Sequence, residues 1–183
     1  MIYFVSETYI RENTPVNANV DIKDLLPNIK PASDMFIMPI LGTNFYTTLL
    51  NSYSAMTLNA NEEILVSYIK PFLAYKTIEI SIPWLTYQVK NKGPQSQTGD
   101  FSSNIDNSTM YYLKKELENR SEWYSQRLVN YLCDNSSLFS GYTNNNSTDL
   151  SPDNSATYDS GIALYDNNCN NCGRCSNCRY LLK

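Results

Sequence analysis

The longest periodic stretch of the chain decides the fold. It covers residues 59–92, which read NANEEILVSYIKPFLAYKTIEISIPWLTYQVKNK. Apolar side chains recur there at alternating intervals of four and three residues, which predicts one stripe along a helix of about 30 residues. The stripe consists of Ile64, Tyr68, Pro71, Tyr75, Ile78, Ile82, Leu85 and Val89. Glu62 and Glu63 favour the first turn electrostatically, and Gly93-Pro94 stops the helix.

Two prolines interrupt this stretch, and a second long helix follows it. Because Pro71 and Pro83 each remove one backbone hydrogen bond, we expect the first helix to kink or split there. After a polar loop over residues 93–107, a second helix is predicted from Asp106 or Ser108 to about Cys133. Its apolar stripe consists of Met110, Leu113, Leu117, Tyr124, Leu128 and Tyr131. Two long helices joined by one loop pack antiparallel.

Shorter helices precede the long pair. Asp21 can cap a short turn that ends near Leu26, and a helix then runs to about Leu41, where Gly42 closes it. Thr43 or Asn44 opens the next helix. The predicted fold class is therefore all-α, a helical bundle with two long antiparallel helices plus short helices, an extended N-terminal arm and a long irregular C-terminal tail.

Changes of composition divide the chain into four predicted parts. They are an N-terminal arm over 1–20, the helical bundle over 21–135, a polar extended tail over 136–168 and a Cys-rich terminal segment over 169–183. We expect the arm, the loop 93–107 and the tail to be able to wrap neighbouring molecules. The 15 tyrosines suit protein contacts that are half buried and half hydrated, although a low-GC genome would also enrich Tyr and Asn.

The charge balance and the absence of histidine limit the function classes. The chain has 14 Lys and Arg against 18 Asp and Glu, a net charge of −4, so nothing predicts sequence-independent binding to DNA. It contains no His, which excludes His-dependent triads and H-E-x-x-H metalloproteases. No phosphate-binding glycine loop or G-x-S-x-G motif occurs. We therefore expect no enzymatic activity and no catalytic residues.

Four cysteines near the C-terminus form the most distinctive motif. Cys169, Cys172, Cys175 and Cys178 follow the pattern C-x2-C-x2-C-x2-C, and the first pair with Gly173 has the form of a zinc knuckle. Four thiolates are the complement of a structural Zn site, but only two residues separate the pairs. Disulfides and free thiols remain open alternatives, whereas an iron–sulfur cluster fits the spacing less well. Cys133 is predicted to be a small packed residue.

The N-terminal residues and the hydropathy of the chain indicate where the protein is made. Residues 1–7 have no basic lead and no long apolar core, so they are not a signal peptide. No apolar run approaches the roughly 20 residues of a membrane helix. We expect a soluble protein, made in the cytoplasm, with no membrane partner.

The helical part of the chain resembles the head-to-tail connector (adaptor) family of tailed bacteriophages, in particular the variants of crAss-like and related gut phages. The resemblance lies in Asn13–Asp21 (NTPVNANVD), Met38–Tyr46 (MPILGTNFY) and the long helix that starts at Asn59 and ends with Val89–Gly93 (VKNKG). It covers about residues 1–135. These motifs are turns and caps, and the family has no catalytic residues to transfer.

The resemblance implies a structural virion protein located in the neck of the particle. It implies a small helical bundle repeated as a homo-oligomeric ring of about twelve copies, bound to the portal protein on one side and to adjacent tail or neck ring proteins on the other. DNA would pass through the channel, during genome ejection for example, without specific binding. The Cys-rich segment departs from the family pattern. Two alternatives are a zinc-binding adaptor or regulatory protein and a tail-assembly scaffolding factor.

Overall fold

The computed structural model describes residues 3–16, 20, 22–90, 93–96, 106–144 and 149–152. Helices make up nearly all of it, and the predicted all-α class is confirmed. The elements in chain order are α1 (Glu7–Asn13), the 3₁₀ helix Ile22–Asp24, α2 (Leu26–Ala32), the π-helix Ser33–Ile37, α3 (Met38–Leu41), α4 (Thr43–Ser54), α5 (Ala60–Thr86), β1 (Tyr87–Lys90), β2 (Gly93–Ser96), α6 (Asn107–Asp134), the 3₁₀ helix Ser136–Leu138 and α7 (Ser140–Thr143).

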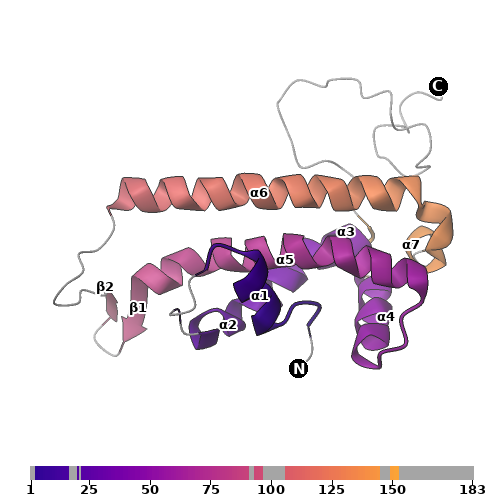
Figure 1. The fold of residues 1–183 in the computed structure, drawn as a ribbon, viewed down its shortest axis with the longest axis horizontal. Coiled ribbons are helices and arrows are strands. Elements are labelled where there is room, and N and C mark those ends of the chain that lie inside the picture. The colour runs from indigo at the N-terminus through magenta and orange to yellow at the C-terminus, as the bar shows by residue number, and fades with distance from the viewer. Residues whose placement is uncertain are drawn as a thin grey trace, which may run out of the picture.

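The two long helices α5 and α6 lie side by side along the length of the molecule (Figure 1). They run antiparallel, as predicted. The order of two ring contacts shows this direction: Tyr68 of α5 stacks on Tyr131 of α6, and Tyr75 of α5 stacks on Tyr124 of α6. The second helix begins and ends within a residue or two of its predicted bounds. Helix α5 passes through both Pro71 and Pro83 without splitting into two elements.

Helices α1, α2 and α4 lie on the side of α5 that faces away from α6 (Figure 1), and α1 and α2 contact α5. Helix α5 is therefore buried on two faces. The predicted stripe forms the face of α5 that packs on α6, where Tyr68 and Tyr75 lie. The first member of the stripe, Ile64, is exposed. The deeper core uses neighbouring positions of the helix. The fully buried core side chains include Leu25, Ile29, Ile37, Leu41, Leu49, Leu65, Ile69, Leu73, Leu128 and Leu132.

Helix α5 ends three residues before the predicted stripe does. Residues Tyr87–Lys90 form β1 and pair antiparallel with Gly93–Ser96, so that Val89 lies opposite Pro94. The prediction of a helix through Val89 and of an irregular loop from residue 93 was thus wrong at this end. Tyrosine and valine favour strands, and a two-residue connection is the commonest length for a hairpin.

Both segments that flank the predicted bundle contribute to its core. In the expected N-terminal arm, Phe4 and Ile10 are fully buried, and the Phe4 ring lies 5.9 Å from that of Tyr46. In the expected polar tail, Phe139 and Tyr142 are buried. The bundle therefore extends to residues 3–13 at one end and beyond residue 135 at the other. The predictions for residues 153–168 and 169–183 concern segments outside the described residues.

Gly42 forms the corner between α3 and α4, as the helix-closing role predicted for it requires. Its φ of 77° and ψ of 148° belong to a region that side chains disfavour. Its N–H donates to the carbonyl oxygen of Met38 over 2.8 Å. Upstream, the π-helix Ser33–Ile37 gives the chain one wide turn between α2 and α3.

Candidate interaction surface on the long helix pair

A buried ion pair lies in the seam between α5 and α6. The Lys76 ammonium donates to the Glu79 carboxylate over 2.8 Å, and the two residues are only 8% and 5% exposed. The Ser121 hydroxyl on α6 lies 3.1 Å from the same carboxylate oxygen, and the ammonium lies 4.4 Å from the centre of the Phe36 ring. Both charged groups of this pair are thus buried, and each has an interaction partner within the protein. The arrangement joins the two helices and offers no approach to a substrate.

Two tyrosine stacks lie along one side of the same seam. Tyr68 and Tyr131 have ring centroids 4.5 Å apart, and Tyr75 and Tyr124 have centroids 5.5 Å apart, each pair at an interplanar angle of 17°. These four residues are called the tyrosine ladder below. Helix α1 contacts α5, and burial, followed by Tyr124 and Tyr75, raises the pKa of Tyr9 on α1.

An arginine and a tryptophan of α6 lie on the ladder. The Arg127 guanidinium is 4.7 Å from the centre of the Tyr68 ring and 5.7 Å from that of Trp123. Trp123 packs edge-on against Tyr124 at 5.0 Å and is still 60% exposed. Arg127 makes no ion pair with any carboxylate of the described residues. Its position is held by aromatic rings alone, so its N–H groups are available to a partner.

A second arginine continues this side of α6 by one turn. Arg120 donates to Glu116 over 3.0 Å. Glu116, and then the hydroxyl of Tyr75, raise the pKa of Arg120 above its ordinary value. Trp, Tyr and Arg are the residue types that dominate the energetics of protein interfaces. We call Arg120, Trp123 and Arg127 the basic edge of α6, and we take this edge with the tyrosine ladder as the candidate interaction surface.

Large apolar side chains are also exposed at the hairpin end of the long helix pair. Trp84 on α5 is 57% exposed, and Tyr111, Tyr112 and Leu113 at the start of α6 are exposed too. The register of the tyrosine stacks places Leu113 opposite the last residue of α5. The predicted stripe of α6 thus reaches the end of α5 at Leu113, and its first member, Met110, lies past that end.

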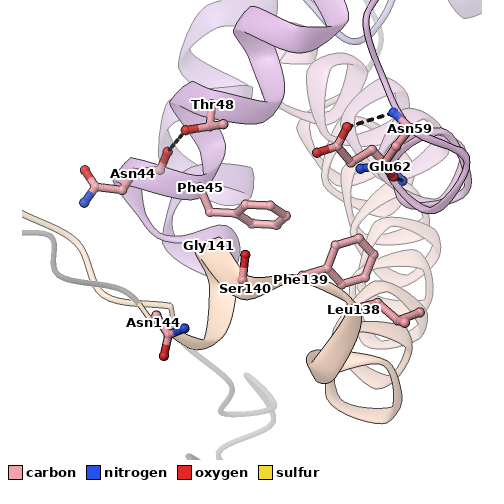
Figure 2. A pocket seen from close by; sticks show the side chains of 10 residues that line it. All are labelled: Asn44, Phe45, Thr48, Asn59, Glu62, Leu138, Phe139, Ser140, Gly141 and Asn144. Carbon is pink, nitrogen blue, oxygen red and sulfur yellow. Dashed lines mark hydrogen bonds between the residues drawn. The ribbon is translucent and has the colours of Figure 1, made fainter.

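A pocket of about 300 Å³ lies at the other end, between α4, the start of α5 and α7 (Figure 2). Asn59 and Glu62 at its rim cap α5 reciprocally: the Asn59 N–H donates to the Glu62 carboxylate over 3.0 Å, and the Glu62 N–H donates to the Asn59 side chain over 2.9 Å. Phe45 and Phe139 project into the pocket between the helices (Figure 2). These polar groups are used for capping, so the pocket is a gap between helix ends.

The predicted metal ligands Cys169, Cys172, Cys175 and Cys178 lie outside the described residues. In the part of the chain that is described, no three His, Cys, Asp or Glu side chains gather as a metal site would require. Cys133 is half buried near the end of α6. No helix within the described ranges is long and apolar enough to cross a membrane.

The basic edge was not predicted from the sequence. Its signal is present in the sequence as a Trp and an Arg four residues apart, Trp123 and Arg127, on a helix whose apolar stripe contains two tyrosines. Helical residues four apart lie on the same side, so the pair could have been identified as one aromatic and cationic patch.

Comparison with known proteins identifies one family. The model of a family described as "Family of unknown function (DUF6712)" matches residues 37–151, which is more than half of the chain. The match runs from the end of the π-helix to the segment after α7. No curated protein and no solved structure matches the chain.

Proposed function

The chain belongs to the family of unknown function DUF6712, and from this starting point we propose that it is a structural virion protein, the head-to-tail connector of a tailed phage. In this proposal it has no enzymatic activity. Copies of the chain form a ring of about twelve subunits between the portal and the next tail or neck ring. DNA passes through the ring without being bound by sequence.

The observation that carries the proposal is the resemblance of three segments to head-to-tail connectors. One of them, Met38–Tyr46, forms the corner between α3 and α4, where Gly42 has a conformation that few other residues adopt. Another begins at Asn59, whose side chain caps α5. The resemblance therefore involves residues that determine how the helices are connected and where they begin.

Two physical properties support a ring around DNA. The net charge of −4 disfavours a tight grip on phosphates. The outer side of α6 is open within the described part and carries Trp123, Arg127 and Tyr112 in exposed positions. Large exposed apolar side chains on a long rigid helix are typical of protein contacts.

The test is electron microscopy of phage particles labelled with a gold-conjugated antibody to this protein, with an antibody to the portal protein as the positional control. We expect label at the single vertex that carries the tail. Particles without label, with the protein left in the soluble lysate, would contradict the connector function. The zinc-binding adaptor and the assembly scaffold would then become the leading proposals.

A further inference from the structure

Helix α6 carries two different charged edges in its middle turns. The basic edge contains Arg127, which makes no ion pair within the described residues. Glu122 stands five positions earlier, which places it about 140° away around the helix. Glu122 makes no ion pair in the described part either, and its neighbour Glu118 is neutralised by Lys115 at 3.0 Å. One positive and one negative side chain, neither in a direct ion pair within the described residues, therefore flank the same outer face, and Lys115 attracts Glu122 only at longer range.

The surface between these charges is exposed. Trp123 and Asn130 lie on it, and no described residue covers them. The Arg127 guanidinium is held against the Tyr68 and Trp123 rings, so little side-chain freedom would be lost on binding. A planar guanidinium with unused donors is matched best by a carboxylate, which it binds through two parallel hydrogen bonds.

We propose that the outer face of α6 binds a second copy of this chain head to tail, with the Arg127 edge of one copy against the Glu122 edge of the next. The inference rests on the proposed connector ring and identifies its subunit contact. A ring requires two different patches on each subunit, because each copy meets its two neighbours through opposite sides. The two edges of α6 are such a pair, and their opposite charges attract each other across the contact between neighbouring copies.

The charges at positions 122 and 127 allow a sharp test in the full-length chain. Arg127→Glu would place two negative edges together, and Glu122→Arg would place two positive edges together. Each single variant is expected to weaken assembly about tenfold or more. The double variant R127E/E122R restores opposite charges at every contact. An equal mixture of the two single variants does so as well, because the two chains can alternate around the ring.

Sedimentation velocity of the wild type, the variants and the mixture measures assembly, and circular dichroism confirms that each variant is folded. Lys114→Glu is the matched control, because it reverses an exposed charge on the same helix away from both edges. We expect wild type and control to form species larger than a dimer, the single variants to dissociate, and the double variant and the mixture to reassemble. If assembly is lost in the single variants and neither the double variant nor the mixture restores it, the proposed pairing of these edges is wrong.

Three further results would overturn the inference. They are a wild-type chain that stays monomeric, a complex that stops at the dimer, and single variants that assemble as the wild type does. The failure of this contact is distinguishable from the failure of the connector function. Label at the neck together with unaffected charge-reversal variants would mean a connector whose copies meet through another face. If no antibody label appears at the neck but the double variant and the mixture restore assembly, the chain forms a ring that functions elsewhere.

Discussion

Lys76 and Glu79 form a buried ion pair in which one turn of α5 supplies both charges and α6 supplies the Ser121 hydroxyl beside them. Removal of one partner leaves the other charge buried and uncompensated. We therefore predict that Glu79→Ala lowers the free energy of unfolding by about 3–5 kcal/mol, whereas the double variant K76M/E79L recovers most of this loss. Urea denaturation measures both.

The pair Lys115–Glu118 is a matched control for this prediction, because it has the same spacing on a helix but is largely exposed. Lys115→Ala is expected to cost less than about 1 kcal/mol. Equal losses for the buried and the exposed pair would show that burial does not determine their contributions.

The tyrosine ladder should act as a set of coupled pairs. Tyr75 and Tyr124 stack face to face, so truncation of one removes part of the benefit of the other. A double-mutant cycle of Tyr75→Ala and Tyr124→Ala is predicted to give a coupling free energy of about 0.5–1.5 kcal/mol. The same cycle with Tyr112→Ala in place of Tyr75→Ala should give a value near zero, since Tyr112 is exposed on another side of α6.

Gly42 provides a prediction about backbone conformation. Its φ of 77° and ψ of 148° are nearly restricted to glycine, so Gly42→Ala should lower the free energy of unfolding by about 1–3 kcal/mol. Met56 also has a positive φ, 56°, and its side chain is exposed. Met56→Gly should therefore stabilise the protein slightly, by less than about 1 kcal/mol. Thermal unfolding of the two variants should shift in opposite directions.

Tyr46 makes stability sensitive to alkaline pH. Burial raises its pKa above 10.0, while the hydrogen bond with Ser33, 2.7 Å long, opposes this in part. A raised pKa means that the folded protein holds the proton more tightly than the unfolded chain does. The corresponding stability is complete below about pH 10 and is lost as the pH rises through the folded value.

The melting temperature measured from neutral to alkaline pH checks this prediction. Tyr46→Phe removes the titrating group, so the variant should lose less stability above about pH 10 than the wild type does. It should also be somewhat less stable at neutral pH, by about 1 kcal/mol, because the Ser33 hydroxyl loses its partner. Parallel curves over the whole range would mean that Tyr46 does not control the alkaline transition.

The position of the bundle boundary can be tested by truncation. Phe139 and Tyr142 are buried against Phe45, so a chain that ends at residue 135 should lose about 3–5 kcal/mol for each buried ring. A chain that ends at residue 152 keeps all of these contacts and should fold. Circular dichroism and thermal unfolding of the two chains distinguish them. Equal stability would place the boundary near residue 135.

The fold was predictable where periodicity and capping residues agree. The stripes that contain Tyr68, Tyr75, Tyr124 and Tyr131 predicted the contact between the long helices, and Gly42 predicted the end of α3. The other face of α5 was missed, because a helix buried on two sides has no contrasting polar face to mark its core. Phe139 was missed because the few apolar residues around it, Leu138 and Tyr142, are too few to give a periodic signal.

The candidate surface was less predictable than the fold. A sequence shows that Trp123 and Arg127 share a side of α6, but only the packing of α5 brings Tyr68 beneath the guanidinium. The absence of a carboxylate partner for Arg127 among the described residues likewise depends on contacts between helices. Such long-range facts have no local signature.

The wide turn at Ser33–Ile37 also determines the phase of the segment from α2 to α3. Ile29 and Leu41 are twelve positions apart and both are fully buried. A regular α-helix would rotate one from the other by about 120°, and a turn that takes up one extra residue reduces this difference to about 20°. The segment from α2 to α3 is thus equivalent to a regular α-helix into which one residue has been inserted. The insertion is confined to a single turn, so Ile29 of α2 and Leu41 of α3 lie on nearly the same side of the segment.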